Sequence, residues 1–249
     1  MQIASLIAAS RLIAEQDAMA MIADNLANAN TPAYEAERMQ FTDWLGPSHP
    51  TFRAAGVLGS IAFVEDRGTW RDRMSGAFRR TGNPFDLAVG NPDAWFTVRT
   101  PRGVRLTRAG DFSLSARGTV VDRNGDPLLD INGRPITLQT TDTGISIAAD
   151  GTLSSIESGV IAQIGLVRPT NPNAMTAEGG WLFNPGGATT KVTAPELEQG
   201  MIEDSNVQPI LEITRMIDAE RQFSFLADFI QAESDRRQNA TTKITSTSS

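Results

Sequence analysis

The N-terminal stretch constrains the fold of this chain most, because its pattern predicts one long helix. Between Gln2 and Ala29 there is no proline or glycine, and apolar residues recur seven positions apart. These rows are Leu12, Met19 and Leu26, beside Leu6, Ile13 and Ala20. A seven-residue spacing returns to nearly the same side of an α-helix, so the rows form one apolar stripe. We predict a helix over about Ile3–Ala29, roughly 40 Å long at 1.5 Å per residue, ending before Thr31-Pro32.

A second long amphipathic helix is predicted at the C-terminal end. Ser205 to about Thr241 contains no glycine and one proline, Pro209, which is tolerated in a first helical turn. Ser205 and Asn206 are candidate caps. Apolar residues at three- and four-residue steps are Ile213, Met216, Ala219, Phe223, Leu226 and Ile230. Periodicity alone leaves two interpretations open: an antiparallel helix pair packed on the chain's own core, or an intermolecular coiled coil.

The middle of the chain predicts antiparallel β-structure between the two helices. Residues 35–82 are broken by glycine and proline and are expected to form an extended or β-hairpin arm. Short alternating segments with turn signals follow, and Asn124-Gly125 and Asn132-Gly133 are typical of type I′ hairpin turns. We therefore predict an α+β fold in which terminal helices form a coiled-coil bundle around an inserted antiparallel sandwich- or barrel-like domain. The expected divisions are 1–34, 35–82, 83–195 and 196–249.

Composition argues against several function classes. The net charge of −7 disfavours binding to a phosphate backbone, so no nucleic-acid partner is expected. The chain has no cysteine and one histidine, His49, which leaves little material for thiolate chemistry, zinc sites or catalytic triads. No apolar run approaches the length of a membrane span, and no secretory signal peptide is visible. We expect no cofactor, no metal, no catalytic residue and no membrane insertion.

The few chemistry-bearing clusters are weak signals. Asp122–Asp126 resembles a calcium loop, but Pro127 and Gly133 replace the glycine and glutamate that an EF-hand requires, so a hairpin is favoured. Carboxylate pairs for glycoside hydrolysis are not singled out. One basic cluster is read either as a solvated, partly self-paired surface or as a contact with an acidic neighbour; it comprises Arg67, Arg71, Arg73, Arg79 and Arg80. Three aromatic residues are expected to pack on the adjoining domain, or else on a neighbouring subunit: Phe52, Trp70 and Phe78.

The asparagines near the end of the first helix have two interpretations. Asn25, Asn28 and Asn30 either end the helix, since asparagine tolerates the left-handed conformation, or fix the register of a coiled coil. The candidate subunit-interface residues are Leu12, Met19, Ile22, Asn25, Leu26 and Asn28 on the first helix and Ile213, Met216, Phe223 and Ile230 on the last.

The segment Ala23–Tyr34 resembles the N-terminal signature of flagellar axial proteins, the rod, hook and hook-associated subunits. That signature reads A-N-N-[IL]-A-N-x-[NS]-T-x-G-[FY]-K, and the chain departs from it at Asp24, Ala33 and Glu35. Near the other end, the chain resembles the family's C-terminal signature at three places. Ser205–Val207 matches its S-N-V start, Met216-Ile217 its M-I pair and Arg221–Phe223 its R-x-F motif.

Motifs between the helices narrow the resemblance to the rod proteins. The run Thr81–Val89 is similar to their approach to the β domain, and Leu106–Leu114 is similar to Y-T-R-x-G-x-F-x-L, with Leu106 in place of tyrosine. Asn91–Phe96 departs from the usual G-x-G-F-F. Chain length and the arginine-rich stretch from Arg67 to Arg80 favour the proximal-rod branch over the distal-rod branch.

The resemblance implies a structural subunit of the bacterial flagellar basal-body rod, in the periplasm. It implies polymerisation through the terminal helices, transmission of motor torque towards the hook, and export by the flagellar type III apparatus without a cleaved signal peptide. The implied partners are further copies of the chain, the other proximal- and distal-rod subunits and the export apparatus. The alternatives are a distal-rod subunit, or a secreted β domain that binds or cleaves carbohydrate.

Overall fold

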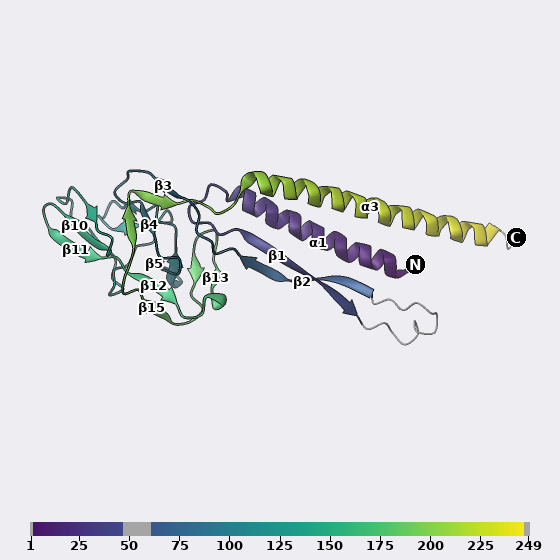
Figure 1. The fold of residues 1–249 in the computed structure, drawn as a ribbon, viewed down its shortest axis with the longest axis horizontal. Helices are drawn as coiled ribbons and strands as arrows, with labels where there is room; N and C mark the ends of the chain where they lie inside the picture. The colour runs from purple at the N-terminus through teal and green to yellow at the C-terminus, as the bar shows by residue number, and fades with distance from the viewer. Residues whose placement is uncertain (1, 47–60, 247–249) are drawn as a thin grey trace. The chain divides into compact units, whose positions relative to one another are not determined.

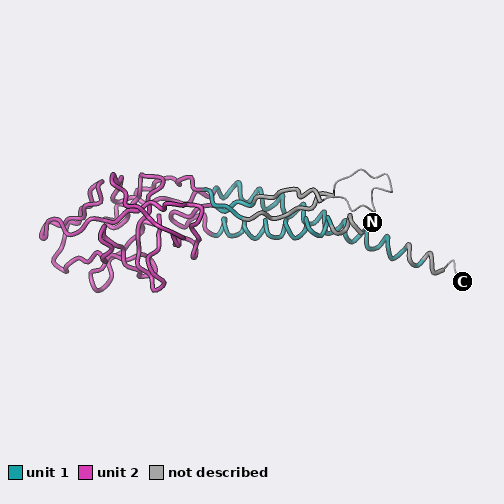
Figure 2. The backbone as a smooth tube through the Cα atoms, turned by 90° about the horizontal axis from the view of Figure 1, so that it is seen from below, with its two compact units in different colours: residues 1–27, 37–72, 208–249 teal, residues 28–36, 73–207 magenta. Residues whose placement is uncertain are grey.

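The computed structural model describes residues 2–46 and 61–246 and divides into two compact units. Residues 1–27, 37–72 and 208–249 form the helical unit, and residues 28–36 and 73–207 form the β unit (Figure 2). Each unit is therefore assembled from segments far apart in the sequence. His49 and Phe52 lie outside the described residues.

Two long helices and one pair of strands make up the helical unit. Helix α1 spans Gln2–Ala27 and helix α3 spans Pro209–Ser246, and the two run side by side in opposite directions (Figure 1). Strands β1 (Glu37–Gly46) and β2 (Ile61–Arg71) pair antiparallel and contact α1. Pro209 is the first residue of α3, where its missing N–H leaves no hydrogen bond unmade. Both predicted terminal helices are present.

The β unit consists of short strands and one 3-10 turn. Its strands are β3 (Phe78–Arg80), β4 (Leu87–Val89), β5 (Trp95–Thr100), β6 (Gly103–Thr107), β7 (Ser113–Leu114), β8 (Val120–Val121), β9 (Ser146–Ile147), β10 (Thr152–Ser155), β11 (Gly159–Gln163), β12 (Leu166–Pro169), β13 (Thr176–Ala177), β14 (Phe183–Asn184), β15 (Thr189–Lys191), β16 (Leu197–Gln199) and β17 (Met201–Glu203). The turn η1 spans Pro172–Ala174.

Every strand pairing in the β unit is antiparallel. The largest sheet has the order β13-β14-β6-β5-β12-β15, and a second has the order β11-β10-β9. Three further pairs, β16-β4, β17-β3 and β7-β8, complete the unit. The predicted fold class, terminal helices flanking an inserted antiparallel β region, is confirmed.

The core of the β unit is apolar on both faces of its central strand. Phe96 and Val98 on β5 are fully buried in the main cluster, where Phe96 packs edge-on against Phe112 with ring centroids 5.1 Å apart. Trp95 alternates to the opposite face and packs against Phe183, with ring centroids 4.9 Å apart. Phe96 and Val98 alternate with Thr97 and Arg99, and this alternation turns the two apolar side chains to the same face of β5.

The two asparagine-glycine turns differ from the predicted type I′ geometry. Gly125 and Gly133 have positive φ, 86° and 75°, but Asn124 and Asn132 do not, so the type I′ prediction is wrong. An aspartate two residues earlier sets each turn instead. Asp122 Oδ1 accepts the N–H groups of residues 124 and 126, at 2.8 and 2.9 Å. Asp130 repeats this arrangement with residues 132 and 134, both at 2.8 Å. These side chains mimic a backbone turn and remove the need for positive φ at asparagine.

Candidate assembly interface

Buried apolar residues, three of them alanines, line the facing sides of α1 and α3 within the helical unit. Ala8, Ala18 and Ile22 on α1 and Ala219 on α3 are buried, each with at most 9% of its surface exposed. Alanine at these positions lets two helix backbones approach closely. The inner apolar row therefore has a partner within the subunit.

The predicted interface residues lie mostly along this inner side. Ile22 and Asn25 are buried. The half-buried residues are Leu12, Met19, Leu26, Asn28, Met216, Phe223 and Ile230. Asn28 belongs to the β unit. Only Ile213 among the ten is exposed, with 46% of its surface accessible.

Asn25 joins the end of α1 to the start of β1. Its Nδ2 donates to the backbone carbonyl of Glu37 and its Oδ1 accepts the N–H of the same residue, both at 2.8 Å. The side chain is fully buried. An amide that carries both a donor and an acceptor can satisfy both backbone groups of one residue at once. In this subunit Asn25 therefore fixes the position of β1 against α1.

A second apolar row on α3 was missed by the sequence analysis. It faces away from the buried residues and comprises Ile210, Leu211, Ile213, Ile217, Phe225 and Phe229. Ile210 is 81% exposed and Phe225 is 70% exposed, and Ile13 on α1 is 59% exposed. The sequence does contain a signal for this second row, because several of its residues also recur at three- or four-residue steps, beside the row that was predicted to be the interface. We call the six exposed apolar residues of α3 the outer row. Exposed apolar side chains gathered on one side of a helix are typical of protein–protein interaction sites.

Two open cavities follow the seam between α1 and α3. One of about 380 Å³ is lined by residues of α1, β1 and α3 that include Met21, Arg38 and Asp218. The other, about 260 Å³, is lined in part by Arg11 and Phe225. Both cavities are also lined by Glu15 and Gln222, so they form one groove along the seam. Burial raises the pKa of Glu15, and Arg11 opposes that shift.

A buried carboxylate links α3 to the strand pair. Glu212 is fully buried, and its Oε1 lies 2.6 Å from Arg38 Nη1 on β1 and 2.6 Å from Arg215 Nη1 on α3. The two guanidinium groups offset part of the carboxylate's loss of hydration at Oε1, whereas Oε2 is buried without a hydrogen-bond partner among the described residues. The pairing fixes the rotation of α3, so that the outer row faces away from the strands.

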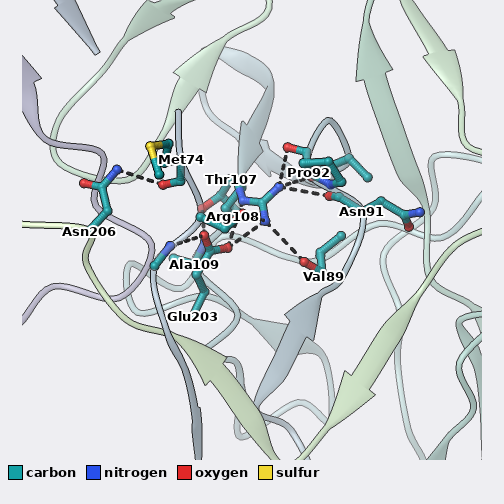
Figure 3. A network of polar contacts seen from close by, with 12 residues as sticks. Met74, Val89, Asn91, Pro92, Thr107, Arg108, Ala109, Glu203 and Asn206 are labelled. Atoms are coloured by element: carbon teal, nitrogen blue, oxygen red, sulfur yellow. Dashed lines mark hydrogen bonds and ion pairs between the residues drawn. The ribbon is translucent and has the colours of Figure 1, made fainter. Parts of the chain in front are cut away.

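Polar contacts in the β unit join three segments of the chain. They are the residues that follow α1, those that follow β2 and those that precede α3. Arg108 and Glu203 form a buried ion pair, with Nη2 2.8 Å from Oε2 and exposed fractions of 4% and 5% (Figure 3). Glu203 Oε1 also accepts the N–H of Gly76, at 3.1 Å. Arg108 further donates to the backbone carbonyls of residues 89, 91, 92 and 94, at 2.8–3.2 Å. The guanidinium group of Arg108 thus donates hydrogen bonds to one carboxylate and to four backbone carbonyls.

Asn206 ties the same three segments together through a second set of bonds. Its Oδ1 accepts the N–H of Ala36 at 2.7 Å, and its Nδ2 donates to the carbonyl of Met74 at 2.8 Å (Figure 3). Its backbone N–H donates to the carbonyl of Tyr34 at 3.3 Å. We call the contacts of Arg108, Glu203 and Asn206 the joint. From the sequence, Asn206 was expected to be a helix cap and part of the S-N-V motif, and neither expectation predicted these bonds.

The left-handed residue after α1 is an alanine. Among the described residues outside glycine, only Ala33 has positive φ, 54°, so Asn25, Asn28 and Asn30 do not adopt that conformation. The helix-ending role expected of them through left-handed geometry is therefore wrong. The N–H of Ala33 donates to the carbonyl of Glu203 at 2.8 Å, and the residue is buried. This hydrogen bond to Glu203, a residue of the joint, holds Ala33 at positive φ, although the Cβ atom of an L-residue makes that conformation sterically unfavourable.

The T-R-x-G-x-F motif has a physical reason at each position. Thr107 Oγ1 accepts the N–H of Ala109 at 3.0 Å, and Arg108 forms the joint. At Gly110 a Cβ would lie 1.6 Å from the carbonyl oxygen of Leu87, so no side chain fits there. Phe112 is 2% exposed in the main core. The motif therefore serves folding rather than catalysis.

The other sequence candidates do not form a chemical site. Arg71 pairs with Glu37, Arg73 donates to the carbonyl of Pro172 and Arg79 pairs with Asp204, which agrees with a partly self-paired surface. Trp70 and Phe78 are 52% and 42% exposed, and their packing on a domain or on a neighbouring subunit stays a prediction. Within residues 2–46 and 61–246, no acidic or histidine cluster is placed to hold a metal ion, and no helix is both long and apolar enough to cross a membrane.

Three family profiles match successive parts of the chain. Residues 6–34 match "Flagella basal body rod protein", residues 91–155 match "Flagellar hook protein FlgE/F/G D1 domain", and residues 198–243 match "Flagellar basal body rod FlgEFG protein C-terminal". The first and last matches fall mainly on α1 and α3, and the second falls within the β unit.

Curated relatives match over nearly the whole length. The chain is 33% identical to the flagellar basal-body rod protein FlgF of Mesorhizobium japonicum, over 90% of both chains. It is 31% identical to FlgF of Caulobacter vibrioides, again over 90% of both chains. FlgG of Bacillus subtilis is 30% identical, over 84% of this chain and 86% of the relative. The alternative of a carbohydrate-active enzyme is thereby excluded, since these are structural proteins. The chain belongs to the flagellar basal-body rod protein family, and it is a non-enzymatic, FlgF-like subunit of that rod.

Proposed function

We propose that this subunit occupies the proximal rod, where it polymerises through its terminal helices and passes motor torque towards the hook. The position is supported by identities of 31–33% to three FlgF relatives, against 28–30% to FlgG relatives. The partners are further copies of the chain, neighbouring proximal-rod subunits and distal-rod subunits. The export apparatus delivers the chain to the growing end.

The observation that carries this proposal is the outer row of α3. A helix that is apolar on two sides has one side satisfied within the subunit and one side left for a neighbour. The groove along the α1–α3 seam is lined by Phe225 of α3 and, further along, by Met21 of α1, so a neighbouring helix packed there would cover apolar surface of both helices. Ridge-into-groove packing of this kind buries side chains from three helices together.

Half-buried apolar residues on the inner side of α1 and α3 also contribute to the proposed contact with a neighbouring subunit. Leu12, Met19 and Met216 are half-buried, so part of their surface remains for the neighbour after α1 and α3 have packed. Ile213 belongs both to the predicted set and to the outer row. Torque requires that the helices do not slip, and the Glu212 ion pairs resist rotation of α3 within the subunit.

Deletion of the gene in its native cell, followed by electron microscopy of isolated basal bodies, tests the position. A block early in rod assembly, with neither hook nor filament, supports a proximal-rod subunit. A proximal segment that assembles and stops before its distal part would favour the distal-rod alternative. Normal flagella in the deletion strain, with no duplicate gene, would contradict both positions.

A further inference from the structure

The β unit carries an exposed apolar projection at the hairpin between β10 and β11. Ile156 is 80% exposed and Val160 is 72% exposed, and both lie at this hairpin of the β unit. We call these two residues the knob. Neither contributes to the core of the β unit. An isolated pair of large aliphatic side chains on a hairpin exposes apolar surface that folding does not require.

Hydrogen bonds brace the hairpin and hold the knob in place. Asp142 accepts from the hydroxyls of Ser155 and Ser158, at 2.9 and 2.5 Å. Glu157 accepts the N–H of Thr143 at 2.6 Å and also the hydroxyl of that residue. These bonds lower the pKa of both carboxyl groups, chiefly through Ser158 for Asp142 and through Thr143 for Glu157. The knob is therefore presented on a preorganised, negatively charged tip, which reduces the entropy lost on binding.

An apolar groove of about 390 Å³ lies elsewhere on the same unit. Strands β5, β6 and β12 and the segment after β15 line it, and its apolar residues include Val104, Leu129, Ile131 and Val192. Val104 and Ile131 are 44% and 37% exposed. The groove is lined on one side by Lys191, one of only two lysines in the chain. Asp130 also lines it, but its Oδ1 already accepts two backbone N–H groups.

We propose that the knob of one subunit docks in the groove of a second copy of this chain. Aliphatic surface meets aliphatic surface, and the carboxylate of Glu157 approaches the ammonium of Lys191. Because knob and groove are different surfaces of one molecule, the contact is heterologous and can repeat from subunit to subunit without closing. The inference rests on the proposed function, since it requires neighbouring copies. A contact of this size is weak alone, but subunits already held by their helices meet at high effective concentration.

Cysteine cross-linking in basal bodies tests this docking directly, because the natural chain has no cysteine. Cells would express an Ile156→Cys chain together with a Thr193→Cys chain, since Thr193 is an exposed residue that lines the groove. Oxidation of isolated basal bodies is expected to give a disulfide-linked dimer only in the mixed population. Replacing the first chain by Ser113→Cys, an exposed position on β7, is expected to abolish the dimer.

A matched pair of substitutions separates docking from folding. Val104 in the groove and Leu114 outside it are each 44% exposed. Adding Val104→Asp to the Thr193→Cys chain is expected to abolish the dimer, whereas Leu114→Asp is expected to leave it unchanged. Absence of the mixed dimer in rods that contain both chains would overturn the inference, and so would a dimer from Ile156→Cys alone. Absence of the chain from basal bodies would overturn the proposed function as well, so the two failures are distinguishable.

Discussion

Replacing Arg108 by methionine removes the central donor of the joint while keeping an unbranched apolar stem. In the natural protein the guanidinium lies within 2.9 Å of Glu203 through both Nε and Nη2, and it donates to four backbone carbonyls. The substitution leaves a carboxylate that is 5% exposed without its counter-ion. Breaking a buried ion pair costs about 3–5 kcal/mol, and carbonyls that lose their donor add to that cost. We expect Arg108→Met to destabilise the β unit by about 4 kcal/mol.

Native-state hydrogen exchange is the appropriate assay, because the two units need not unfold together. Amides of β5 and β6 report on the β unit, and their opening free energy is expected to fall in Arg108→Met. The variant Arg108→Met/Glu203→Gln removes the stranded charge and is expected to recover part of the loss. A decrease below about 1 kcal/mol in the single variant would refute the assignment of Arg108 as the central residue of the joint.

Three further outcomes follow from named contacts. Ala33→Gly is expected to stabilise the protein by about 1 kcal/mol in denaturant unfolding, because glycine adopts φ 54° without steric cost; unchanged stability would contradict the strain. Gly76→Ala is expected to destabilise it by at least about 1–3 kcal/mol, because a Cβ would lie 1.8 Å from the carbonyl oxygen of Asp204; a neutral result would place this close approach in doubt. The hydrogen bond from Arg105 lowers the pKa of Glu178, so the stability it contributes is complete above the ordinary value of 4.5 and is lost as pH falls through the lower folded-state value. A carboxyl titration by NMR is expected to give a midpoint below 4.5 that rises in Arg105→Gln, and a natural midpoint at or above 4.5 would oppose this.

The sequence was sufficient to predict the terminal helices and the antiparallel β region. Helix α1 needed only the absence of proline and glycine and a seven-residue spacing, and Pro209 marked the start of α3. The short strands were signalled by alternation, as in β4 and β5. These are local signals, and the burial of an amphipathic face translates them directly into structure.

What the sequence analysis missed depends on contacts between distant residues. The pairing of Arg108 with Glu203 joins positions 95 apart, and the bond from Ala36 to Asn206 joins positions 170 apart. No periodicity connects such residues. The outer row was missed for a different reason: α3 is apolar on two sides, and spacing alone does not say which row faces its own subunit. The structure decides this through Glu212, which turns the inner row towards α1 and β1.

The central claim is that the outer row of α3 joins this subunit to its neighbours in the rod. Ile217→Asp and Phe225→Asp place a charge on side chains that are 43% and 70% exposed, so both chains should fold with natural helix content by circular dichroism. Gln238→Asp adds the same charge at an exposed polar position of α3 and serves as the control.

The direct measurement is the recovery of each variant in basal bodies isolated from the deletion strain, by immunoblot with electron microscopy of the rods. Folded Ile217→Asp and Phe225→Asp chains that are absent from basal bodies, with Gln238→Asp present, are the predicted result. Incorporation of both apolar-to-charged variants at the natural level would contradict the claim.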